Sequence, residues 1–262
     1  MRNLILFVLM FLMLLSSNSF AKTWYIKSDG YGDAPTIKAG VHSCVAGDTV
    51  LVAAGQYEFN DDAGTYLKNG LVVISESGPL STILIGIPSV WPTRAFYGHL
   101  LTFDQQRNEI NGFWFKNFDS AIMLDGGDCL VKNNIFSTNI VGLTLSFESS
   151  FSVENNTFYN DTKYAIDASN ACQGSYLLCN IIWGQAIGLN FSVAFSNVFF
   201  DLADSYPYQS VNISVNPEFC GETAGNFFLQ SDSPCAPSNN PIYENHLDPF
   251  FFRQVHYSLY YF

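Results

Sequence analysis

The amino-acid sequence predicts an all-β protein, a parallel β-helix (β-solenoid) whose coils stack along the chain. The first observation is a six-residue pattern that recurs five times, at spacings of 21, 22, 25 and 17 residues. Its copies are INGFWF (110–115), VKNNIF (131–136), VENNTF (153–158), LCNIIW (178–183) and FSNVFF (195–200). Repeats of about this length are single supersecondary units that bury their apolar face by stacking on their neighbours.

The second observation is that the five copies align in columns. Each copy opens on an apolar residue, and its third place holds Gly112, Asn133, Asn155, Asn180 or Asn197. Each closes on an aromatic residue: Phe115, Phe136, Phe158, Trp183 and Phe200. Asparagine and glycine suit a sharp bend between two strands. At a strand spacing of about 4.8 Å, the side-chain amides of the asparagines can hydrogen-bond from one coil to the next. An ordinary β-sandwich is the alternative, and it leaves the five aromatic matches unexplained.

A second strand follows each copy. Alternation directs one set of its residues inward: Ile122, Leu143, Ile166 and Ile187, then Leu124, Leu145, Ala168 and Leu189. The residues between and after them face outward, which predicts a polar lateral strip built from successive coils. We take six positions of this strip as candidate ligand-binding residues: Asp125, Thr144, Ser146, Asp167, Ser169 and Asn190.

The N-terminal residues 1–21 predict a secretory signal peptide. Arg2 precedes the apolar run Leu4–Leu15, and small residues follow it at the cleavage place. The run is shorter than a typical membrane span, so no span is expected after cleavage, although an uncleaved anchor is the alternative. The chain is expected to divide into the signal peptide, a β-helix domain at 22–237 and a poorly ordered aromatic tail at 238–262.

Residues 23–57 predict the cap of the solenoid. A strand begins at Tyr25, and Pro35 stands at the start of a short helix, Thr36–Cys44. The strand Thr49–Val52 follows. Stacked repeats need such a cap because their first coil otherwise exposes its apolar end.

Composition limits the partners. The chain has a net charge of −12 and only 11 Lys and Arg residues, which disfavours nucleic acid because no basic stripe neutralises phosphates. It also disfavours polyanionic glycans unless cations bridge.

Six cysteines and an exported chain predict disulfides. Short separations favour the pairs Cys172–Cys179 and Cys220–Cys235, which leaves Cys44 and Cys129 either paired or buried and free.

Several segments resemble a known family. DAPTIKAGVHSCVAGDTVLVAAGQYEF (33–59), LVVISESGPLSTILIG (71–86) and EINGFWFKN (109–117) resemble the opening of secreted right-handed parallel β-helix repeat proteins of the pectin lyase-like superfamily. VNPEFCGETAGNFFLQSDSPCAP (215–237) is similar to the closing segment of many bacterial members. The resemblance implies a right-handed helix, and polysaccharide as the class of partner.

The catalytic residues of such lyases and hydrolases are not evident. No arginine stands between Arg107 and Arg253, and residues 110–200 contain no histidine. Asp125 and Asp128 are weak candidates for a Ca²⁺ site, and a glycine turn is the favoured interpretation. No other cofactor is expected.

We therefore expect a secreted or cell-surface module that binds an extracellular polysaccharide or surface glycan, or that is structural. The alternative is a polysaccharide lyase or glycoside hydrolase with its site in lateral loops. A third possibility is a fragment of a longer surface protein.

Overall fold

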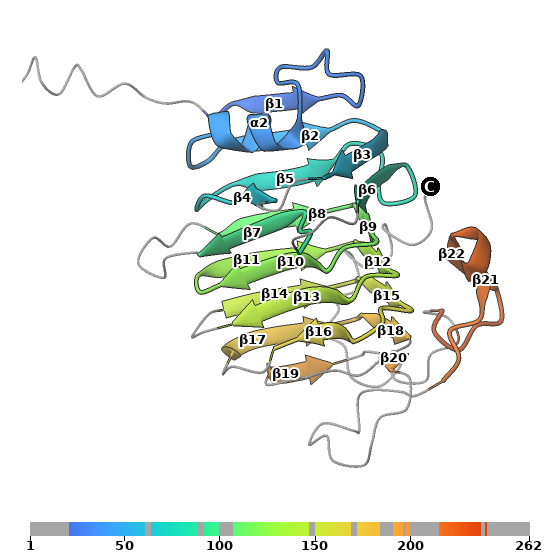
Figure 1. The fold of residues 1–262 in the computed structure, drawn as a ribbon. Coiled ribbons are helices and arrows are strands. Elements are labelled where there is room, and N and C mark those ends of the chain that lie inside the picture. Colours follow the sequence, from blue (N-terminus) through green and yellow to red (C-terminus); the bar gives the residue numbers. More distant parts are fainter. Residues whose placement is uncertain are drawn as a thin grey trace, which may run out of the picture.

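The computed structural model describes residues 21–60, 64–87, 92–99, 107–146, 150–168, 172–183, 191–195, 198–199, 215–236 and 239. Their strands stack as a parallel β-helix, which confirms the predicted fold (Figure 1). The predicted signal peptide lies outside these residues except for Ala21, and the predicted tail lies outside them except for Asn239. No helix in the described part is long and apolar enough to cross a membrane.

Three sheets form the walls, and each coil adds strands to them in turn. Sheet A has eight strands: β1 (Thr23–Ile26), β2 (Thr49–Val52), β5 (Val72–Ser75), β8 (Asn108–Asn111), β11 (Asp128–Lys132), β14 (Ser150–Glu154), β17 (Cys172–Leu178) and β19 (Phe191–Phe195). Sheet B has seven: β3 (Gly55–Phe59), β6 (Thr82–Gly86), β9 (Trp114–Lys116), β12 (Ile135–Ser137), β15 (Thr157–Tyr159), β18 (Ile181–Trp183) and β20 (Val198–Phe199). Sheet C has five: β4 (Thr65–Tyr66), β7 (Phe96–His99), β10 (Ser120–Asp125), β13 (Val141–Ser146) and β16 (Tyr164–Asp167).

The bend from sheet A to sheet B uses left-handed backbone. Gly112, Asn133, Asn155 and Cys179 occupy it, with φ of 83°, 55°, 54° and 54°. Glycine and asparagine tolerate this region well. The predicted bend column is thus confirmed for its first three members. Asn180 is a correction, because Cys179 takes the bend in that coil.

A ladder of buried asparagines follows this bend. Asn134, Asn156 and Asn180 lie one above another, and each amide oxygen accepts a hydrogen bond from the backbone N–H of the coil before it, at 2.9–3.0 Å. Each amide nitrogen donates to a sheet A carbonyl. The internal ladder therefore lies one residue later than predicted for Asn133 and Asn155.

The aromatic column stacks inside the coil. The rings of Phe115 and Phe136 are 4.9 Å apart and those of Phe136 and Phe158 are 4.6 Å apart, nearly parallel in both pairs. The fourth predicted member, Trp183, is a correction. Ile182 pairs with Phe158, and Phe199 pairs with Ile182.

The difference at Trp183 comes from the register of strand β17. Leu177, not Leu178, pairs with Val153, because strand β17 ends at Leu178, one residue earlier than the alignment assumed. Trp183 consequently pairs with Tyr159 on the outer side, and Phe200 lies outside the described residues.

The second inward set is confirmed where the structure describes it. Ile122, Leu143 and Ile166 are in register and fully buried. Leu124, Leu145 and Ala168 are buried beside them. Ile187 and Leu189 lie outside the described residues.

Helix α2 (Ile37–Ser43) is the predicted cap. The Thr36 side chain accepts a hydrogen bond from Ala39 N at 3.0 Å and so caps the first turn of the helix. Ile37, Gly40 and Val41 are buried against the first coil, beside β1 and β2 (Figure 1).

A short hairpin covers the outside of sheet B. Strands β21 (Phe219–Gly221) and β22 (Asn226–Leu229) pair antiparallel around the 3₁₀ turn η2 (Glu222–Ala224) and lie beside β15 and β18 (Figure 1). Two residues of the hairpin and two residues of sheet B form a buried outer cluster: Phe219 and Phe227 with Trp114 and Ile135. The Trp114 and Phe227 rings meet edge to face at 5.4 Å. The outer face of sheet B is therefore covered around β9, β12, β15 and β18.

Replacing Gly225 by alanine should loosen this hairpin. Gly225 has φ of 79°, and an added Cβ would lie 2.5 Å from the Trp114 ring. A left-handed alanine costs about 1–2 kcal/mol before any clash. Hydrogen exchange in β22 should therefore speed up. Gly221→Ala is the matched control, since its backbone is extended and its nearest neighbour would be 3.8 Å away. Equal exchange in the two variants would contradict this packing.

The cysteines follow a different pattern from the one predicted. The structure corrects the Cys220–Cys235 disulfide, because both thiols are free. Strand alternation exposes Cys220 while Phe219 beside it is buried, and Cys235 is buried in the following turn. Cys44 and Cys129 are buried and free, one of the two predicted outcomes. The Cys172 side chain is not described, so its pairing stays a prediction.

Candidate functional site

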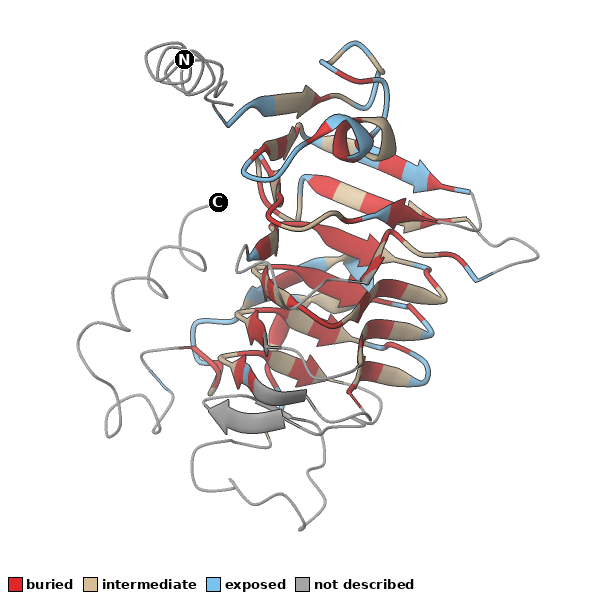
Figure 2. Ribbon diagram, turned by 90° about the vertical axis from the view of Figure 1, so that its left-hand side faces the viewer, coloured by how far each residue is buried: buried red, intermediate tan, exposed pale blue. Residues whose placement is uncertain are grey.

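The outer face of sheet C is the candidate binding surface. The hairpin covers the middle of sheet B, and the outer face of sheet A contains side-chain bonds between coils, such as Lys132 Nζ to Glu109 at 3.2 Å. Along the strands of sheet C buried and half-buried residues alternate, as Figure 2 shows for the coils in general. The half-buried residues form what we call the sheet C face.

One column of the sheet C face crosses all five strands. Its members pair directly from strand to strand: Tyr66, Tyr97, Met123, Thr144 and Asp167. Four strand spacings of about 4.8 Å give the column a length of roughly 19 Å. That length suits an extended chain of several small units better than a single compact molecule.

The column is aromatic at one end. The rings of Tyr66 and Tyr97 meet edge to face at 5.4 Å, and Tyr66 is 38% exposed. The pair presents an apolar surface with hydroxyl groups at its rim. Sequence reasoning missed both residues, because their coils precede the first copy of the repeat. The alternation of Thr65-Tyr66 and Phe96-Tyr97 is the signal that identifies them.

The other end of the face is polar. The hydroxyls of Ser120 and Thr144 are 2.9 Å apart, and the Ser146 hydroxyl donates to Asp125 Oδ1. Asp167 stands half-buried beside Thr144. The structure therefore brings four of the six candidate residues together: Asp125, Thr144, Ser146 and Asp167. Ser169 and Asn190 lie outside the described residues.

The two candidate metal ligands do not converge. Gly126 and Gly127 have φ of 71° and 77° and turn the chain between Asp125 in sheet C and Asp128 in sheet A. Asp128 pairs with Arg107 Nε at 3.3 Å, whereas Asp125 accepts from Ser146. Among the described residues no group of three or more His, Cys, Asp or Glu could hold a metal ion. The geometry favours the glycine turn.

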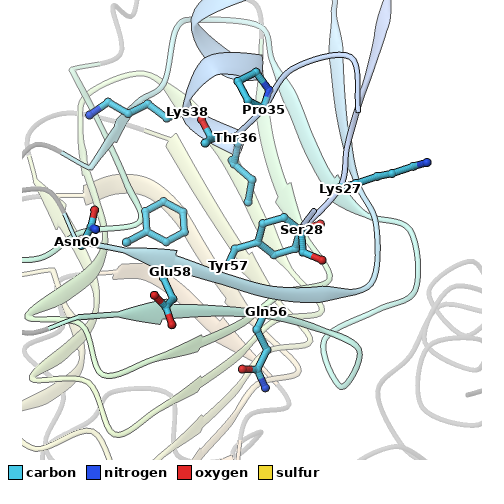
Figure 3. A pocket seen from close by; sticks show the side chains of 11 residues that line it. Lys27, Ser28, Pro35, Thr36, Lys38, Gln56, Tyr57, Glu58 and Asn60 are labelled. Atoms are coloured by element: carbon cyan, nitrogen blue, oxygen red, sulfur yellow. The ribbon is translucent and has the colours of Figure 1, made fainter. Parts of the chain in front are cut away.

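A groove of about 380 Å³ lies between strand β3 and the segment around α2 (Figure 3). Tyr57 is in its wall, and its hydroxyl donates to the Ala53 carbonyl at 2.9 Å. Burial raises the pKa of Tyr57 to about 12. Lys27 and Lys38 stand at opposite ends of the groove and do not converge. The groove therefore offers no assembled acid, base or nucleophile.

Comparison with known protein families identifies the family of this chain. The model of the family described as "Periplasmic copper-binding protein (NosD)" matches residues 45–248, which is more than three quarters of the chain. No curated protein matches the sequence. The match begins just after the capping helix and extends through the stacked coils and the hairpin.

Proposed function

From the premise that this chain belongs to the NosD family, we propose that it is an extracytoplasmic β-helix module that binds a neutral saccharide chain along the sheet C face. The family description is periplasmic, which supports a place outside the cytoplasm. Secretion or display at the cell surface is the finer form of this proposal.

The observation that carries the proposal is the continuous column from Tyr66 to Asp167. Aromatic rings offer a flat apolar surface to the C–H face of a sugar, and hydroxyl and carboxylate groups match its hydroxyls. The sheet C face has the rings at one end and Thr144, Ser146, Asp125 and Asp167 at the other. Successive coils repeat at a constant spacing, which suits a polymer that also repeats.

The charge of the sheet C face favours neutral saccharide chains. The strands of sheet C contain no lysine or arginine, and the chain carries a net charge of −12. A uronate polymer would meet the carboxylates of Asp125 and Asp167 without a compensating cation. We therefore expect weak binding that favours neutral or cation-bridged glycans, without turnover.

Copper, named in the family description, does not fit the described residues. Copper sites in proteins use grouped imidazole, thiolate or thioether ligands. In the described ranges no such group of histidines and cysteines with carboxylates occurs. Burial raises the pKa of Cys44 to about 11 and also raises that of Cys129, so both remain neutral thiols at neutral pH. The proposal takes no step through the metal.

Tyr97→Ala tests the proposal. Loss of one ring should weaken binding of a neutral oligosaccharide about tenfold, or about 1.4 kcal/mol. An array of glucans, xylans, mannans and polygalacturonate would identify the best neutral probe, and calorimetric titration would measure the change.

Tyr176→Ala is the matched control, because Tyr176 is an exposed tyrosine on sheet A. An equal loss in both variants would contradict the assignment to sheet C. Tight, calcium-independent binding of polygalacturonate would overturn the charge argument. Release of unsaturated products from a glycan would show turnover and would overturn the expectation that the protein only binds.

A further inference from the structure

A second ladder runs along the bend from sheet B to sheet C, and a carboxyl group takes part in it. The Asn139 amide oxygen accepts from Phe118 N at 3.0 Å, and its Nδ2 donates to the Phe115 carbonyl at 3.2 Å. One coil later the same place is occupied by Asp161. Its Oδ1 accepts from the Asn139 backbone N–H and side-chain Nδ2, at 2.9 and 3.0 Å.

The other oxygen of Asp161 has no such role. Asp161 is 1% exposed, and its Oδ2 is buried without a hydrogen-bond partner. Phe136 stands in register with Phe115, so Oδ2 takes the place at which an asparagine would donate to the Phe136 carbonyl. A carboxylate oxygen cannot donate, and two facing acceptors repel each other.

The side of Oδ2 that faces Gly142 is closely packed. A Cβ added to Gly142 would lie 2.8 Å from Asp161 Oδ2, 2.6 Å from the Ala165 carbonyl oxygen and 3.1 Å from the Phe158 ring. A proton fits this space and turns Oδ2 into a donor.

Among the described residues, no charged side chain compensates Asp161. The ionisable residues on the elements around it are Asp119, Lys116, Tyr159, Lys163, Tyr164 and Asp167. All are half-buried or exposed, whereas Asp161 is buried in the wall. The Lys163 ammonium lies over the Tyr164 ring at 5.2 Å. None of these residues contributes to the shift of the Asp161 pKa.

We infer that Asp161 is a neutral carboxylic acid in the folded protein at neutral pH, with Oδ2–H donating to the Phe136 carbonyl, and that its ionisation loosens the coil in alkaline solution. The proton passes to hydroxide or buffer base. Burial supports this state by raising the pKa of Asp161 to about 8, against the opposing effect of its bonds from Asn139. Strand β16 begins three residues after Asp161, so the bend that contains Asp161 lies at the polar end of the sheet C face. The inference does not depend on saccharide binding.

The pH dependence of stability tests it. The unfolded aspartate loses its proton near pH 4, whereas the folded one keeps it up to about pH 8. The folded state therefore binds one more proton between these values, and its stability falls as pH rises through this window. The folding equilibrium constant should fall about tenfold per pH unit from Asp161 alone.

The experiment compares urea unfolding from pH 5 to pH 9 in the natural chain, Asp161→Asn and Asp232→Asn. Asparagine supplies the missing donor, so Asp161→Asn should lose this slope and be more stable at pH 7. Asp232 is exposed, and Asp232→Asn should keep the slope. Equal slopes in all three would overturn the inference. Infrared spectra of the natural chain provide an independent reading: a buried carboxylic acid C=O band at pH 6 that vanishes at alkaline pH is expected, and its absence at pH 6 would also overturn the inference.

Discussion

Phe136→Ala should lower the free energy of unfolding by about 3–5 kcal/mol, the range for truncation of a buried ring. Phe136 is fully buried and stacks on Phe115 on one side and on Phe158 on the other. The coil cannot collapse around the cavity, because strand pairing on both sides fixes the spacing of the rings. Urea unfolding followed by circular dichroism measures the loss.

Phe228→Ala is the control, since this phenylalanine is 40% exposed in the hairpin. Its effect should stay within about 0.5 kcal/mol. The Phe136→Ala and Phe158→Ala effects should not add, because the two rings touch and share one cavity when both are removed. An unchanged unfolding midpoint for Phe136→Ala would contradict the stacked core.

The repeat could be predicted from the sequence because it reflects alternation within each coil. Inward residues such as Phe115, Phe136 and Phe158 must be apolar, and the bends at Gly112, Asn133 and Asn155 need left-handed backbone. These two demands recur once per coil, so they leave a period in the sequence. The cap could be predicted for a different reason, because Pro35 and Thr36 are local signals for a helix start.

The position of the ladder could not be fixed in the same way. The second and third copies contain two adjacent asparagines, so the single Asn180 of the fourth copy aligns equally well with either. The structure shows that the buried ladder requires the amide, whereas the bend also accepts Cys179. The alignment matched Asn180 to the wrong asparagine of the earlier copies. This one-residue error placed Trp183 in the core, whereas in the structure Trp183 pairs with Tyr159 on the outer side.

Contacts between distant segments left no local signal. Trp114 packs on Phe227 from a hairpin more than a hundred residues later, and Tyr66 meets Tyr97 from another coil. Asp161 resembles any polar turn residue until its place beneath Asn139 is known. The disulfide prediction failed because sequence separation does not show which way a side chain points: Cys220 is exposed and Cys235 is buried.

Asn156→Ala should lower the free energy of unfolding by at least about 3 kcal/mol, because it leaves several buried polar groups unpaired at about 1–3 kcal/mol each. Asn156 Oδ1 accepts from the Asn134 backbone and side chain at 3.0 and 3.1 Å. Its Nδ2 donates to the Val131 carbonyl at 2.9 Å and to Asn180 Oδ1 at 3.0 Å. Alanine replaces none of these bonds, and the site is 1% exposed, so water cannot substitute.

Asn155→Gly is the control one residue away, and it distinguishes the ladder from the bend. Asn155 is half-buried with φ of 54°, and glycine adopts that conformation freely, as Gly112 does at the same bend of the first copy. The glycine variant should therefore lose no more than about 1 kcal/mol, from the added freedom of the unfolded chain. Urea unfolding of both variants measures the difference. A larger loss in Asn155→Gly than in Asn156→Ala would place the ladder one residue earlier and would contradict the register described above.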